Sequence, residues 1–152
     1  MYFDGSVSKA GVGVGVYIIS PTKYSKGHSY KLIFECSNNV AEYEALLLGL
    51  RALKDLGMKR VQIFGDSELV VNQVHDVYQT KHSRMRAYRN EVWDMFRNFF
   101  TEHTVQVISR DEYTVADSLA TAAGKFEAPA ARKKKYKLEI VNRPSIPDNT
   151  KH

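Results

Sequence analysis

The stretch Gly11-Val12-Gly13-Val14-Gly15-Val16-Tyr17-Ile18-Ile19 decides the fold class of this chain. A valine or isoleucine stands at every second position from residue 12 to residue 18, which is the periodicity of a β-strand with one buried face. Glycines occupy the opposite face over residues 11–15, where another backbone could approach closely. The stretch therefore predicts a β-strand whose apolar face is formed by Val12, Val14, Val16 and Ile18.

Shorter patterns on either side of this strand extend it into a sheet. Residues 2–6 form a strand that joins it through a hairpin over Ser8-Lys9-Ala10, and residues 31–36 form a third strand after a turn at Pro21. Consecutive hairpins predict antiparallel pairing of these three strands. Farther along, strands alternate with helices, which predicts parallel pairing among strands 2–6, 60–65 and 105–108.

Helical patterns connect and follow these strands. Residues 40–56 carry an apolar stripe, with Asn39 as the expected N-cap, and Gly57 ends the helix. Further helices are expected over residues 67–77, 83–101 and 114–126. Together these elements predict an α/β domain with a mixed five-stranded sheet and helices packed on it.

Length and composition indicate one domain. The 152 residues can bury a core without disulfides, and the single cysteine, Cys36, excludes an intramolecular disulfide. No Cys/His spacing indicates a zinc site, and no apolar run is long enough to cross a bilayer, so we expect no membrane association. No basic region precedes an apolar stretch at the N-terminus, so we expect no signal peptide and an intracellular protein, in the cytoplasm or the nucleus.

Positive charge is concentrated at the C-terminal end. The net charge is +5, and residues 127–152 hold seven Lys or Arg against three Asp or Glu. Prolines and the run Lys133-Lys134-Lys135 also interrupt any periodic pattern there. We therefore expect a domain over residues 1–126 and a basic, proline-containing linker or tail over residues 127–152. The charge of the tail says little about nucleic-acid binding by the domain itself.

Four acidic residues stand among apolar or small neighbours: Asp4, Glu42, Asp66 and Asp117. Asp4 interrupts the first strand, Glu42 lies on the buried stripe of the first helix, Asp66 ends strand 60–65, and Asp117 lies in an Ala/Leu-rich segment. If the fold brings them together, their mutual repulsion requires a cation. Carboxylate oxygens are hard ligands that suit Mg²⁺ rather than Zn²⁺.

Each of these acids also has a structural interpretation when it is taken alone. Asp4 fits a turn before Gly5, Glu42 fits a capping box with Asn39, and Asp66 fits a helix N-cap. Asp117 is harder to explain in this way, because a helix would bury its charge without a visible partner. For Asn38 and Asn39 the alternative is a helix cap, and for the basic group at residues 81–89 it is a solvated helix face.

In chain order, the segments around the four acids resemble the type 1 ribonuclease H family. The matching segments are Phe3-Asp4-Gly5-Ser6, Asn38-Asn39-Val40-Ala41-Glu42-Tyr43-Glu44-Ala45, Gly65-Asp66-Ser67, and Arg110 followed by Ala116-Asp117-Ser118-Leu119-Ala120. The resemblance covers residues 2–124 and is greatest to the ribonuclease H domain of plant LTR-retroelement polyproteins, next to a reverse transcriptase. It implies a ribonuclease H-like fold with helices on both faces of the sheet.

The resemblance also implies a function. Family members are endonucleases that hydrolyse the RNA strand of RNA–DNA hybrids with two Mg²⁺ ions, for which Mn²⁺ can substitute. The matching metal ligands and catalytic residues here are Asp4, Glu42, Asp66 and Asp117. The expected partners are the hybrid and a covalently linked reverse transcriptase domain. The candidate hybrid-binding residues are Ser37, Asn38, Asn39, Arg84, Arg86 and Arg110, with Lys81 and Arg89 near them.

The sequence departs from the family pattern around the last acid. Glu68 stands where the family often has Gln, Tyr113 replaces an Asn, and no His lies between Val107 and Asp117. Residues 77–83 are too few for the basic protrusion of some cellular enzymes. Two other functions therefore stay open: a hybrid-binding domain with weak or no activity, and an exonuclease that acts on single strands.

Overall fold

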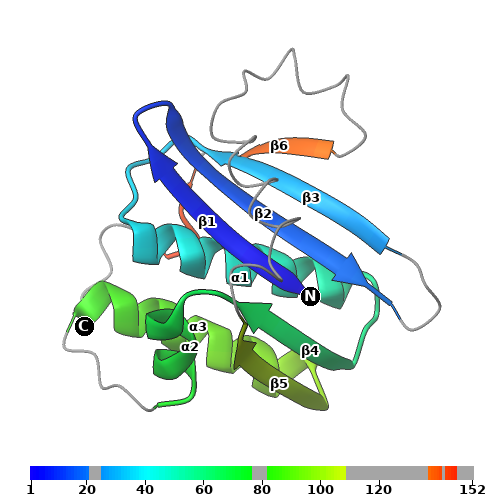
Figure 1. Ribbon diagram of the computed structural model, residues 1–152. Coiled ribbons are helices and arrows are strands. Elements are labelled where there is room, and N and C mark those ends of the chain that lie inside the picture. Colours follow the sequence, from blue (N-terminus) through cyan, green and yellow to red (C-terminus); the bar gives the residue numbers. More distant parts are fainter. Residues whose placement is uncertain (21–24, 77–81, 109–136, 142, 147–152) are drawn as a thin grey trace.

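In the computed structural model, the alternating stretch forms strand β2 (Gly11–Ile19) inside a six-stranded sheet (Figure 1). The structure describes residues 1–20, 25–76, 82–108, 137–141 and 143–146. The apolar face of β2 is buried as predicted, at Val12, Val14, Val16 and Ile18. Strand β2 pairs antiparallel with β1 (Tyr2–Ser8) through a turn at Lys9 and Ala10, and antiparallel with β3 (Ser25–Leu32).

The remaining strands pair in parallel, and the sheet order is β5-β4-β1-β2-β3-β6. Strand β4 (Arg60–Gly65) lies between β1 and β5 (Glu102–Val107), as the alternation of strands and helices predicted. The third strand was predicted over residues 31–36, which is wrong, because it runs from Ser25 to Leu32. Its first residues are polar and show no alternation, and their register with the long partner β2 brings them into the sheet.

A sixth strand corrects the predicted count of five. Strand β6 (Lys137–Val141) pairs in parallel with β3, from His28 opposite Lys137 to Leu32 opposite Val141. It covers the backbone edge of β3, which would otherwise be open to pairing with another chain. The sequence did not predict this short strand, because a lysine run and prolines lie close to it. Part of the expected tail is therefore built into the sheet, while the domain boundary at residue 126 stays a prediction.

The described helices begin at side-chain caps. Helix α1 (Asn38–Asp55) starts after Ser37, whose Oγ accepts a hydrogen bond from the Val40 N–H at 3.2 Å. The predicted cap at Asn39 is therefore wrong. Helix α2 (Glu68–Val74) is shorter than predicted, and helix α3 (Ser83–Phe99) lies within its predicted range. The helix expected over residues 114–126 lies outside the described residues.

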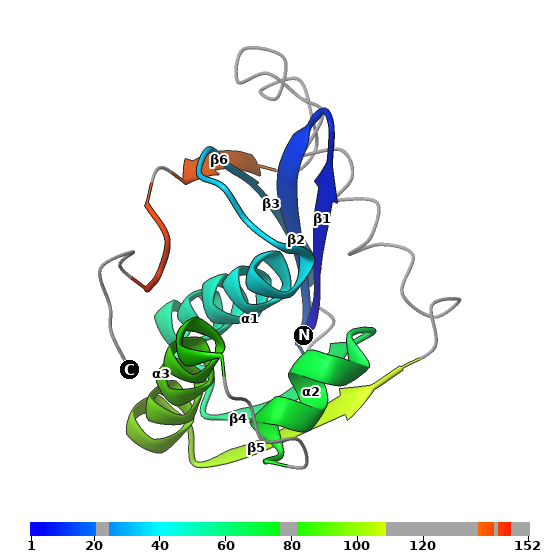
Figure 2. The same ribbon diagram turned by 90° about the vertical axis from the view of Figure 1, so that its left-hand side faces the viewer.

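The core lies between the sheet and helix α1. Helix α1 packs on β1 and β2, and α3 packs against α1 on the same face of the sheet (Figure 2). The apolar stripe of α1 is fully buried at Leu46, Leu47 and Leu50. Among the described residues, no helix is both long and apolar enough to span a membrane.

Candidate metal centre

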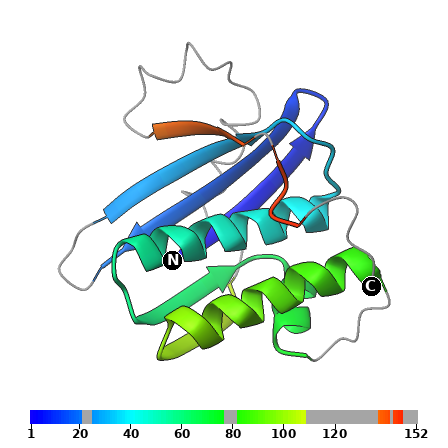
Figure 3. The same cartoon turned by 180° about the vertical axis from the view of Figure 1, so that it is seen from behind.

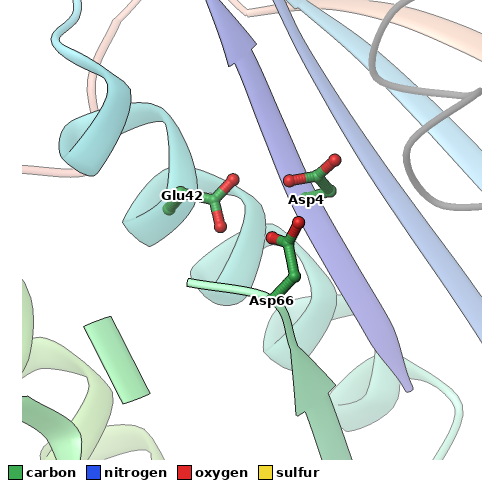
Figure 4. A group of neighbouring side chains, drawn as sticks. All are labelled: Asp4, Glu42 and Asp66. Atoms are coloured by element: carbon green, nitrogen blue, oxygen red, sulfur yellow. The ribbon is translucent and has the colours of Figure 1, made fainter. Parts of the chain in front are cut away.

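Three of the four predicted acids meet at one point of the fold. Asp4, Glu42 and Asp66 each offer a carboxylate oxygen, and these oxygens all lie within 4.8 Å of one another. The three side chains point toward one another from β1, α1 and the end of β4 (Figure 4). Asp117 and Arg110 lie outside the described residues.

The sheet register places Asp4 beside Asp66. Phe3 of β1 lies opposite Gly65 of β4 in the parallel pair, so the residue that follows each of them in the chain is one of the two acids. Asp4 also pairs with Gly15 of β2 and is only 5% exposed. It stands in the middle of a strand, so its interpretation as a turn residue is wrong.

Glu42 reaches the cluster because α1 runs very close to β1. A Cβ atom on Gly5 would lie only 2.6 Å from the Ala41 carbonyl carbon, so a glycine is needed there. The close approach lets the Gly5 N–H donate a hydrogen bond to Glu42 Oε1. Because the N-cap is Ser37, Glu42 lies in the second turn and is not the return half of a capping box.

Asp66 lies on the connection from β4 to α2. The N-cap of α2 is Ser67, whose Oγ accepts a hydrogen bond from the Val70 N–H at 3.3 Å, so Asp66 is not the cap. Asp66 is half-buried, whereas Asp4 and Glu42 are buried. The cluster therefore has two carboxylates inside the protein and one on its solvent side.

The chemistry of this donor set fits a divalent cation. Carboxylate groups this close repel one another when they are ionised, and a bound cation removes that cost. The ligands are all oxygens, which suits a hard ion such as Mg²⁺ or Mn²⁺. The Gly5 N–H holds Glu42 in place, in the way that partners of metal ligands usually orient them.

Two buried tyrosines connect α1 to helices α2 and α3. The Tyr43 hydroxyl donates a hydrogen bond to Gln73 Oε1 of α2 at 2.7 Å, and its ring stacks on Tyr88 of α3 with centroids 5.7 Å apart. Burial raises the pKa of both tyrosines, and the neighbouring Glu44 raises that of Tyr88 further. Both hydroxyls therefore stay protonated at neutral pH and act as donors.

The candidate hybrid-binding residues fall into two groups in the structure. Ser37 and Asn38 are exposed, and Asn39 is half-buried, at the end of α1 that also carries Glu42. Ser37 is the N-cap, so Asn38 and Asn39 are in the first turn and leave their amide groups for other uses.

The arginines of α3 have partners inside the protein. Arg84 donates a hydrogen bond to the Ile146 carbonyl at 2.9 Å, and its guanidinium lies over the Tyr88 ring. Arg89 lies over the Trp93 ring at 4.4 Å and pairs with Asp76 at 3.6 Å. Arg86 is half-buried on the same helix, and Lys81 lies outside the described residues. Arg84 and Arg89 therefore make contacts within the protein, unlike the residues of a fully solvated helix face.

Two residues on the elements that carry Asp4 and Glu42 were missed in the sequence. Gly5 is needed for the contact with α1, and its place directly after Asp4 was the available signal. Glu44 is fully buried in α1, two residues after Glu42. An acid in the Ala/Leu-rich part of a helix was the signal for Glu44.

The motifs and the site agree with the comparison with known proteins. A family model described as reverse transcriptase-like matches residues 3–123. The chain belongs to the reverse transcriptase-like family. The chain is similar to the ribonuclease HI of Halobacterium salinarum, a curated protein. The two are 30% identical over 125 residues, which are 80% of this chain and 62% of the relative. The uncharacterised protein YpeP of Bacillus subtilis is 30% identical over 129 residues, 79% of this chain and 56% of the relative.

Solved structures confirm the fold of this reverse transcriptase-like chain. LC11 ribonuclease H1 in complex with an RNA/DNA hybrid is 28% identical, with a TM-score of 0.72 over 80% of this chain and 92% of that one. The predicted resemblance to type 1 ribonucleases H, and the predicted fold class, are therefore confirmed. The chain spans less than two thirds of the length of either curated relative.

Proposed function

We propose that this chain is an endonuclease that hydrolyses the RNA strand of RNA–DNA hybrids and depends on Mg²⁺. The observation that carries the proposal is the gathering of Asp4, Glu42 and Asp66 oxygens within 4.8 Å of one another. The three acids stand on the motifs that resemble ribonuclease H, and a similar protein has been solved with a hybrid bound. Mn²⁺ is expected to substitute for Mg²⁺.

The three carboxylates would hold the metal. Asp4, Glu42 and Asp66, together with Asp117 as the fourth predicted ligand, would bind two ions. Bound there, such a pair of ions would supply Lewis-acid chemistry, which would lower the pKa of a bound water and stabilise charge on a leaving phosphate oxygen. Strand β1 and the end of β4 are rigid supports, so Asp4 and Asp66 keep the cluster's geometry. Glu42 closes the cluster from α1, held by the Gly5 N–H.

The exposed start of α1 supports hybrid recognition beside the metal site. Exposed Ser37 is the candidate for a phosphate contact, and the amides of Asn38 and Asn39 are the candidates for the 2′-hydroxyl and base edges of a shallow minor groove. Arg84, Arg86 and Arg110 are the candidates for phosphate contacts. Such contacts would make hybrid affinity fall as salt rises.

A linked reverse transcriptase domain and an intracellular location, in the cytoplasm or the nucleus, belong to the same proposal. The description of the matching family and the partial coverage of the curated relatives support a place in a larger polypeptide. Residues 77–83 are too few for the basic protrusion of some cellular enzymes. In a larger polypeptide, the linked domain would therefore add affinity for the hybrid.

The test is cleavage of end-labelled RNA in four substrates with Mg²⁺: an RNA–DNA hybrid, an RNA duplex, and each single strand. We expect internal cuts in the RNA strand of the hybrid alone. Stepwise shortening from one end of a single strand would favour an exonuclease. A folded protein that binds the hybrid without cutting it would indicate a binding domain instead.

A further inference from the structure

Glu44 is a fully buried carboxylate that lies away from the metal cluster. The Tyr88 hydroxyl of α3 donates to its Oε2 at 2.5 Å. Two more hydrogen bonds come from Ser145, whose backbone N–H donates to Oε2 at 2.8 Å and whose hydroxyl donates to Oε1 at 2.7 Å. A buried carboxylate is costly unless donors surround it, and two of these three donors come from a residue 101 positions away.

The segment that carries Ser145 is anchored on both sides of it. We call residues 143–146 the C-terminal clasp. The Ile146 side chain is buried in the core at 7% exposure, and its carbonyl accepts a hydrogen bond from Arg84 of α3 at 2.9 Å. The clasp follows β6 and lies against the N-terminal half of α1, as the red segment of Figure 3 shows. It therefore ties α1 and α3 together.

Helix α1 connects the clasp to the metal cluster. Glu42 and Glu44 are two residues apart, which places them about 200° apart around the helix at 100° per residue. One side of this turn is held to β1 by the hydrogen bond from Gly5 to Glu42. The other side is held by Ser145 and Tyr88 through Glu44. The same turn is thus fixed from two directions.

We propose that Ser145 is a positioning residue for the metal site, which acts through Glu44 and α1 to set the distance of Glu42 from Asp4 and Asp66. Without the Ser145 hydroxyl, the Glu44 carboxylate lacks a donor for Oε1, and the turn shifts to bring that oxygen toward water. The inference rests on the proposed function only in treating the three acids as a metal site.

The test compares Mg²⁺ affinity by titration calorimetry in the full chain and in three variants. Ser145→Ala removes the hydroxyl and keeps the backbone N–H, and Ser145→Thr keeps both donors. Leu53→Ala is the control, because Leu53 is buried in the last turn of α1 and its loss destabilises the core without touching Glu44. We expect Ser145→Ala to weaken Mg²⁺ binding by roughly three- to tenfold, less than the 10–100-fold typical of direct partners of metal ligands.

Ser145→Thr should keep the wild-type Mg²⁺ affinity. Leu53→Ala should lower the melting temperature without changing the Mg²⁺ affinity. If Ser145→Ala lowers the melting temperature and leaves Mg²⁺ affinity intact, Ser145 is structural only and the proposal is overturned. If the wild type binds no Mg²⁺, the proposal fails with the metal site. If the affinities change as expected and the hybrid is still not cut, the positioning role stands and the proposed function fails.

Discussion

Gly5 is the residue at which the packing of α1 and the geometry of the metal site depend on each other. In Gly5→Ala the new Cβ would overlap the Ala41 backbone at 2.6 Å, so α1 must move away from β1. We expect a loss of about 1–3 kcal/mol of unfolding free energy, as for overpacking in general. Mg²⁺ affinity should fall as well, because Glu42 moves with the helix.

A glycine elsewhere provides the control for this substitution. Gly57 has φ +77° and open space around it, so Gly57→Ala costs about 1–2 kcal/mol through backbone strain alone. Urea unfolding and Mg²⁺ titration of both variants separate the two effects. Equal Mg²⁺ affinity in both variants would show that the contact of Gly5 with Ala41 does not govern the site.

Among the three acids, we expect the removal of the Asp66 carboxylate to separate activity from folding most cleanly. It is half-buried and lies outside the strand ladder, so Asp66→Asn should leave the circular dichroism spectrum unchanged. Hybrid cleavage should drop by more than about 100-fold, beyond the range for indirect partners of metal ligands. Asp94→Asn is the matched control, since within the described part of the chain Asp94 forms only an exposed pair with Arg97. Near wild-type turnover in Asp66→Asn would show that Asp66 is not a ligand.

Helices α1 and α3 are joined by a contact that depends on a protonated tyrosine. Burial and Glu44 raise the pKa of Tyr88 above its ordinary value of 10.0. A group whose folded-state pKa is raised stabilises the fold fully below its unfolded pKa, and that stability is lost as pH rises. The contribution of Tyr88 to the free energy of unfolding should therefore be steady up to about pH 10 and fall above it.

The variant Tyr88→Phe tests this dependence. It should cost about 1.5–3 kcal/mol at pH 8, where the hydrogen bond to the Glu44 carboxylate is lost. Its further loss between pH 10 and 11 should be smaller than that of the wild type, although the raised pKa of Tyr43 leaves part of the decline. Urea unfolding across this pH range measures both effects, and equal slopes would contradict the role of Tyr88.

Helices and strands with a regular apolar spacing could be predicted from the sequence. Boundaries that depend on pairing with distant segments could not. Strand β2 and the start of α3 followed directly from apolar spacing. The cap of α1 was assigned to Asn39 instead of Ser37, because Ser and Asn are about equally good N-caps and only the backbone distinguishes them. The first residues of β3 are polar and enter the sheet through pairing with β2.

The same difference between local motifs and distant contacts holds for the site. Asp4, Glu42 and Asp66 could be grouped from the sequence, because each lies on a short motif that resembles the ribonuclease H family. Strand β6 was hidden by the basic composition around it. The contact of Glu44 with Ser145 could not be predicted, since it joins positions 101 residues apart and both residues are ordinary in isolation.

For the whole molecule, the metal should also stabilise the fold. In the proposed site, Mg²⁺ would bind only where the three carboxylates are assembled, so it would favour the folded state by mass action. At ten times its Kd, we expect a gain of about 1.4 kcal/mol, or roughly 3–6 °C in melting temperature. The Asp66→Asn variant should show little of this rise. Calorimetric melting with and without Mg²⁺ measures it, and a rise in that variant equal to wild type would place the metal elsewhere.

The central claim is that acids from β1, α1 and the end of β4 form one metal site that drives hybrid cleavage. The most direct test is the cleavage rate of the RNA strand of a hybrid by the wild type and Asp4→Asn, in Mg²⁺ and in chelator. We predict that the wild type cuts only with Mg²⁺ and that Asp4→Asn, although folded, does not cut. Cleavage by the wild type that continues in chelator, or cleavage by folded Asp4→Asn at the wild-type rate, would contradict the claim.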